Sequence, residues 1–162
     1  MNITYIVEIE YHDNNIYILK FFQKNHRHSD NRYSLVNSKK FLDHHNTTGT
    51  KNFLLILNTV LKIYLDIYES NKKSSFGFMG APTVMELDPD RTSNKINVDG
   101  TVEKTKRFNA YSIYVKRYFS PENFEHIEIP TSSCYLVKSK KNTALTKERI
   151  EVFFENYIAT YC

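Results

Sequence analysis

The chain has 162 residues, of which 41% are hydrophobic and 14% aromatic, with only four glycines and four prolines. This length fits one domain spanning 1–162, and the apolar content excludes a disordered chain. The net charge of +4, from 22 basic and 18 acidic residues, is too small to indicate a polyanionic partner by itself.

Cysteine usage and the termini bear on the compartment. The two cysteines, Cys134 and Cys162, exclude a disulfide framework, and their spacing does not match a zinc site. The first residues lack the basic segment of a signal peptide, and Lys62 and Asp66 interrupt the one long apolar run. We therefore expect a cytoplasmic protein without a membrane span. The heavy use of Asn, Lys, Ile and Tyr is typical of AT-rich coding sequence and suggests a phage or bacterial host-defence setting.

The first third of the chain predicts short strands. Alternation over Ile3–Tyr11 places Tyr5, Val7, Ile9 and Tyr11 toward a core and Glu8 and Glu10 toward solvent. A turn rich in Asn and Asp leads to a return strand at Ile16–Phe22, and Arg32–Val36 predicts a third short strand.

The stretch Asn52–Glu69 predicts the helix around which the chain is organised. Apolar residues fill most of its circumference, so we expect it to be covered on several sides. A strand at Ser74–Met79 follows. The acidic segment 81–104, with a possible turn at Asp99-Gly100, predicts either a protruding hairpin or a mobile loop.

The remaining elements are a helix at Arg107–Phe119, strands at Phe124–Ile129 and Ser132–Lys138, and a last helix capped by Thr146. The fold class expected from this order is α+β, with a mostly antiparallel sheet of about five strands packed against a buried central helix and two further amphipathic helices.

Two basic segments are the candidate binding residues. If the fold brings them together, they form a strip suited to a nucleic-acid backbone, whereas the ordinary alternative is a solvated helix face and a charged loop. The residues are Lys104, Lys106, Arg107, Lys116 and Arg117 in the first segment, and Lys138, Lys140, Lys141, Lys147 and Arg149 in the second. Arg107 near a helix N-terminus is also a candidate anion site, for a phosphate or a carboxylate.

Signals for catalysis are weak. His26-Arg27-His28 and Asp43-His44-His45 lie in stretches predicted as loops and are interpreted as surface histidines rather than metal ligands. The same histidines permit a metal-independent ribonuclease using His26, His28 or His44, which we keep as an alternative. Asp88-Pro89-Asp90 lacks the downstream ligands of a calcium loop. Phosphate-binding glycine loops and nucleophile elbows are absent from the sequence, so we expect no cofactor, no metal and no enzymatic activity.

Four short stretches together resemble a family of small, uncharacterised bacterial α+β proteins, some of which are carried on mobile elements. The resemblance spans roughly Ile16–Lys138 and implies a strand, a glycine turn and a helix led by an arginine, with no established activity. The stretches are Ser29-Asp30 with Tyr33, Ile56-Leu57 with Thr59-Val60, Ser75-Phe76-Gly77-Phe78 with Gly80, and Thr105-Lys106-Arg107 with Tyr111. The acidic segment after Gly80 departs from the family's compact pattern.

These patterns favour a non-enzymatic binding protein that engages nucleic acid or a nucleoprotein complex through a basic surface. Besides the ribonuclease, a protein-only interaction module remains an alternative. Such a module predicts a homodimer formed through exposed tyrosines such as Tyr114 and Tyr161.

Overall fold

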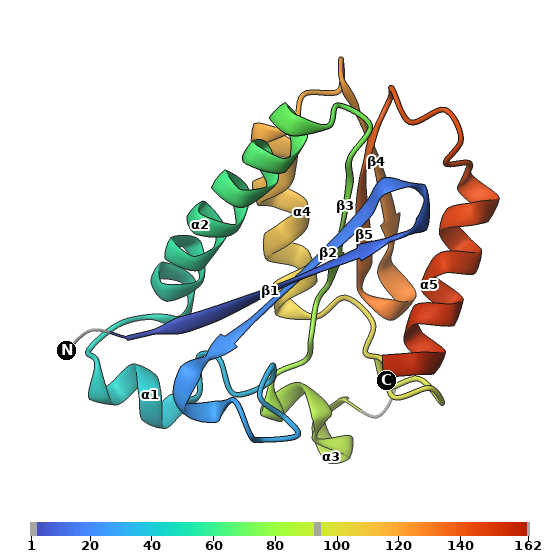
Figure 1. The fold of residues 1–162 in the computed structure, drawn as a ribbon. Helices are drawn as coiled ribbons and strands as arrows, with labels where there is room; N and C mark the ends of the chain where they lie inside the picture. The colour runs from blue at the N-terminus through green and yellow to red at the C-terminus, as the bar shows by residue number, and fades with distance from the viewer. Residues whose placement is uncertain (1–2, 93–94, 162) are drawn as a thin grey trace.

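The computed structural model describes residues 3–92 and 95–161, so Cys162 lies outside the described residues. Its centre is a five-stranded sheet with the strand order β1-β2-β3-β5-β4 (Figure 1). The strands are β1 (Tyr5–His12), β2 (Ile16–Gln23), β3 (Ser75–Met79), β4 (Phe124–Ile129) and β5 (Cys134–Ser139). Strands β2 and β3 pair in parallel, and the other pairs are antiparallel. The expected α+β fold with a mostly antiparallel sheet is confirmed.

Helices cover both faces of this sheet (Figure 1). Helices α2 (Gly49–Ser70) and α4 (Lys106–Tyr118) pack on one face, in a core that includes Tyr64, Phe76 and Tyr111. Helix α5 (Lys147–Tyr161) covers the other face, where Ile150 and Phe154 meet Ile18 and Leu136. The short helix α1 (Lys39–His44) lies in the crossover from β2 to β3.

Helix α2 is the long apolar helix expected from the sequence, but it is buried along one side only. Phe53, Leu57 and Tyr64 are buried, whereas Leu55 is 61% exposed and Leu65 40% exposed. The helix packs on one face of a sheet, so no second layer covers its outer side. The expectation that it would be covered on several sides is therefore wrong.

The outer strand β1 also departs from the simple alternation. Tyr5 and Val7 pack against the core beneath α2, as expected, but Ile9 and Tyr11 are exposed. The hairpin end of β1 extends past α2 and is covered on its opposite face by α5, where the His12 ring lies 5.1 Å from the Phe153 ring (Figure 1). The acidic face predicted for solvent is therefore the half-buried face.

The third strand predicted at Arg32–Val36 does not form. Backbone hydrogen bonds in this stretch are local, from Arg32 N to Ser29 O (3.1 Å) and from Ser34 N to Asn31 O (2.8 Å). Because successive turns satisfy these groups, they are not available for a strand ladder. Val36 at the end of the stretch is buried in the core.

Segment 81–104 connects β3 to α4 and is described except for residues 93 and 94. It contains a short 3-10 helix, η3 (Val84–Leu87), closed by a capping box from Thr83, and the short helix α3 (Pro89–Thr92). A single antiparallel bridge joins Ile96 to Val102 across a turn with Gly100 at φ 81°. Thr101 and Val102 are buried, and Ser133 Oγ donates to Val102 O at 2.6 Å. This anchors the last part of the segment beside the end of β3.

Candidate functional site

The first basic segment is divided by helix α4. Lys104 and Lys106 lie at its N-terminal end, whereas Lys116 and Arg117 lie in its last turn. A helix rises about 1.5 Å per residue, so roughly 15 Å of helix axis separates the two pairs. The basic residues of the first segment therefore lie in two groups, one at each end of α4.

Arg107 is not a surface residue. Its side chain is buried, and its guanidinium donates to the carbonyl oxygens of Tyr33 (2.5 Å) and Val36 (3.2 Å). These bonds explain why the 33–36 stretch turns inward. A nucleic acid on the surface cannot reach this guanidinium.

The second basic segment lies at the same end of the molecule as the C-terminus of α4. Four connections meet there and are joined by hydrogen bonds. Lys140 N donates to Asn123 O at 2.9 Å, and Ser139 Oγ donates to Lys72 O at 2.5 Å. Asn142 Nδ2 donates to Asn14 O in the β1–β2 turn at 2.7 Å. The turns at 13–15, 71–74, 120–123 and 139–142 thus form one surface.

Some basic residues at this end are already neutralised. Ion pairs join Lys72 to Glu69 (2.7 Å), Lys116 to Glu128 (2.9 Å) and Lys138 to Glu125 (3.3 Å). Four exposed side chains have no carboxylate partner within the described ranges 3–92 and 95–161. We call these the basic end: Lys73, Arg117, Lys140 and Lys141.

A separate cavity lies where the two parallel strands part. The β2–β3 ladder ends at the pair Ile18–Gly77, after which β2 continues with β1 and β3 turns away at Gly80. The opening is a cavity of about 160 Å³ between Leu19–Phe21 on one side and Met79–Pro82 on the other. A crevice at the carboxyl ends of parallel strands is a common place for ligands in α/β sheets.

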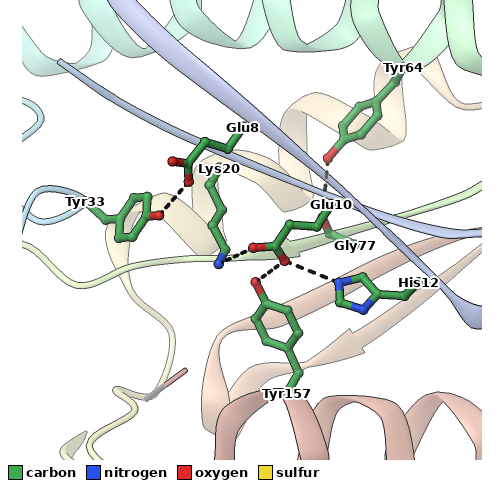
Figure 2. A network of polar contacts seen from close by, with 8 residues as sticks. All are labelled: Glu8, Glu10, His12, Lys20, Tyr33, Tyr64, Gly77 and Tyr157. Atoms are coloured by element: carbon green, nitrogen blue, oxygen red, sulfur yellow. Dashed lines mark hydrogen bonds and ion pairs between the residues drawn. The ribbon is translucent and has the colours of Figure 1, made fainter. Parts of the chain in front are cut away.

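A polar network lies beside this cavity, on the face covered by α5 (Figure 2). The Glu10 carboxylate pairs with Lys20 Nζ at 2.5 Å and accepts a hydrogen bond from Tyr157 OH at 2.9 Å. His12 Nε2 lies 3.2 Å from the same carboxylate. Tyr33 OH donates to Glu8 at 2.8 Å, and the Lys20 ammonium also lies 4.3 Å from the centre of the Tyr161 ring.

Burial and charge set the ionisation of these groups. Burial raises the pKa of Glu10, but hydrogen bonds from Lys20 and Tyr157 and the lysine charge outweigh it, so the net pKa is lowered. Burial and then the Glu8 carboxylate raise the pKa of Tyr33 to about 12. Burial and the Glu10 carboxylate raise the pKa of Tyr157. At neutral pH the network is a carboxylate–ammonium pair held by neutral phenols.

Two buried polar side chains line the cavity: Arg107, which lacks a carboxylate partner among the described residues, and Tyr111, whose hydroxyl lacks a hydrogen-bond partner among them. Arg107 has no ion pair with a carboxylate of the described residues, and burial lowers the pKa of its guanidinium, which the charge of the Glu86 carboxylate only partly opposes. The Tyr111 hydroxyl, on a side chain only 3% exposed, has no hydrogen-bond partner in the part of the chain that the structure describes. Burial raises its pKa, so it is a neutral donor.

Sequence reasoning missed Glu10, Lys20, Tyr111 and Tyr157. The acids of β1 and the lysine of β2 were visible as alternating residues on paired strands. The tyrosines were indistinguishable from ordinary core residues. Helical spacing identifies the buried face of a helix, but it does not indicate whether that face lines a cavity.

The histidines considered for catalysis and the buried Cys134 each lie in local contacts. Within residues 3–92 and 95–161, no three His, Cys, Asp or Glu side chains gather as a metal site. His28 accepts a hydrogen bond from Arg27 Nε at 2.8 Å, and the rings of His44 and His45 lie 4.8 Å apart. Cys134 is buried in the core with its Sγ 3.6 Å from Ser132 O.

The tyrosines considered for a homodimer differ in exposure. Tyr114 is buried against α2, where its hydroxyl donates to Asn58 Oδ1, so its predicted exposure is wrong. Tyr161 is 57% exposed.

The fold and these two surfaces define a single-domain α+β protein with a basic end and a separate interior cavity. No helix in the described ranges combines the length and apolarity that crossing a bilayer requires. No known protein-family model, no curated protein and no solved structure matches this chain.

Proposed function

We propose that this is a non-enzymatic binding protein that engages the phosphate backbone of nucleic acid through the basic end. One observation carries the proposal. Turns from four distant parts of the chain are bonded together, so Lys73, Lys140 and Lys141 lie on one surface at the end of α4 that carries Arg117. None of the four side chains has a carboxylate partner among the described residues. Lysine and arginine side chains that contact phosphates displace the counterions condensed on the nucleic acid, and the release of these ions favours association.

The proposal retains only those basic residues predicted from the sequence that lie at the basic end. Lys140, Lys141 and Arg117 remain in it, and Lys73 joins them. Lys104 and Lys106 lie at the other end of α4, Arg107 is buried, and Lys116 and Lys138 are paired with glutamates. The cytoplasmic, phage or host-defence setting belongs to the same proposal and rests on the sequence composition alone.

The test uses two double variants of equal charge. Lys140→Glu with Lys141→Glu changes the basic end, and Lys104→Glu with Lys106→Glu places the same charge change at the opposite end of α4. Binding to labelled single-stranded RNA and double-stranded DNA is followed by fluorescence anisotropy over a range of salt concentrations. We expect the first variant to weaken binding strongly and to reduce the salt slope by about two, and the second to leave the slope nearly unchanged.

The same experiment contains its refutation. Equal losses in the two variants would mean that only net charge matters, and an absence of binding at low salt would end the nucleic-acid proposal. Gel analysis of the RNA after incubation addresses the ribonuclease alternative. Cleavage that persists with chelator and disappears in His28→Ala or His44→Ala would replace the proposal with that alternative.

A further inference from the structure

The cavity between β2 and β3 has the size and lining of a small-molecule site. Its volume of about 160 Å³ is close to the roughly 150 Å³ of an engineered cavity that holds benzene. Apolar walls come from Leu19, Phe21, Met79 and Val102. Gly100 and Tyr161 on its rim are exposed, so the cavity opens to solvent there.

The charges around the cavity are not balanced. Lys20 at one side is neutralised by Glu10 at 2.5 Å. Arg107 is 6% exposed and is bound only to two backbone carbonyls among the described residues. A guanidinium carries five N–H donors, so three remain after these bonds. No carboxylate of the described residues lies within ion-pair distance of this buried cation, and the charge of Glu86 only partly offsets its burial, so a bound anion would lower the remaining cost.

The Tyr111 hydroxyl is a second, independent indication of a ligand. It belongs to a side chain that is almost completely buried, it lines the cavity, and it has no hydrogen-bond partner within 3–92 and 95–161. The hydroxyl oxygen is not one of the fully enclosed polar atoms that lack a partner, so it is accessible from the cavity rather than sealed in the core. Arg107 and Tyr111 are one helical turn apart on α4, so both present donors from the same face.

We propose that this cavity binds a small organic anion of about the size of one aromatic ring. Its negative group pairs with Arg107 and accepts a hydrogen bond from the Tyr111 hydroxyl, while its ring lies against the apolar walls formed by β2 and β3. An aromatic monocarboxylate is the chemical class that meets these requirements, because a carboxylate accepts the planar guanidinium fork. This site is distinct from the basic end and does not depend on nucleic-acid binding.

The test compares benzoate with its neutral analogue benzyl alcohol by isothermal titration calorimetry on the whole chain. Ala81→Leu fills the cavity from the loop after β3, and Tyr111→Phe removes only the hydroxyl. Tyr118→Phe is the matched control, because it removes an exposed hydroxyl elsewhere on α4. Arg107→Met is less suitable, since it also breaks the bonds that hold Tyr33 and Val36.

We expect benzoate to bind roughly tenfold more tightly than benzyl alcohol, because a charge-assisted hydrogen bond distinguishes them. Ala81→Leu should abolish benzoate binding, Tyr111→Phe should weaken it roughly tenfold, and Tyr118→Phe should leave it unchanged. Equal binding of the two compounds, no binding of benzoate, or unchanged affinity in Ala81→Leu or Tyr111→Phe would each overturn the proposal. Circular dichroism of each variant confirms that the fold is retained.

Discussion

Replacing Gly80 by alanine tests how tightly the end of β3 packs on the start of α4. A Cβ added at Gly80 would lie 2.5 Å from Thr105 Oγ1, 2.7 Å from Phe108 N and 2.9 Å from Phe108 Cβ. Ordinary contacts between such atoms are about 3.5–4.0 Å, so the first turn of α4 must move by several tenths of an ångström or more. Because Phe108 N is a backbone atom of α4, it cannot move aside by a change of rotamer as the end of a side chain can.

The size of the effect follows from the bonds at this contact. Thr105 Oγ1 donates to Gly80 O at 2.7 Å and accepts from Phe108 N at 3.1 Å, so it both ties the strand to the helix and caps α4. Overpacking costs about 1–3 kcal/mol, and a weakened cap or buried hydrogen bond about 1 kcal/mol each. These costs overlap, so we expect the free energy of unfolding to fall by about 2–4 kcal/mol.

Urea unfolding followed by circular dichroism measures this loss, with two other glycines as controls. At Gly77 the nearest atom is the tip of the Ile18 side chain, which can change rotamer. At Gly100 a Cβ would meet nothing within 4 Å, and only the positive φ of 81° is unfavourable, at about 1–2 kcal/mol. If Gly80→Ala loses no more stability than Gly100→Ala, the packing described for α4 is wrong.

Two further outcomes follow from the polar contacts. Glu10→Gln removes a carboxylate whose pKa is lowered in the folded state, so the stability that this group contributes is present above the ordinary pKa of 4.5 and is lost as the pH falls through the lower folded value. Unfolding curves of the wild type and Glu10→Gln should therefore differ most above about pH 5 and converge in acid, and a constant difference would contradict the network. Ser133→Ala loses the bond to Val102 O (2.6 Å) and the acceptor for Thr105 N (2.9 Å), so we expect a loss of about 1–3 kcal/mol and faster hydrogen exchange at the Thr105 amide. Unchanged exchange there would show that this contact does not hold segment 95–105.

Local patterns predicted the helices and most strands. The spacing of Ile150, Phe154 and Tyr157 identified α5, and the long apolar run identified α2, because a single buried face imposes a period on the sequence. The strand predicted at Arg32–Val36 was wrong, since a guanidinium more than 70 residues away in sequence binds its carbonyl groups. No local pattern contains that contact.

The candidate site was less predictable for the same reason. Arg107 was correctly noticed as a residue at the start of a helix, but its burial depends on the turns of 33–36 lying over it. The alternation of apolar and polar residues along β1 predicts that Glu10 faces solvent. In the structure α5 covers that face of the strand. The proximity of the turn carrying Lys140 to the C-terminal end of α4 likewise comes from the Lys140–Asn123 bond between connections, not from helical or strand spacing.

The contact between Glu10 and Tyr157 joins residues 147 positions apart, and the bond between Asn142 and Asn14 spans 128. During translation the hairpin leaves the ribosome long before its partner helix exists. Charged side chains on an edge strand oppose its pairing with other chains, and Glu8, Glu10 and Lys20 supply such charges on the hairpin before α5 covers that face. Neither contact can form until the segment that carries Asn142 and Tyr157 has been synthesised.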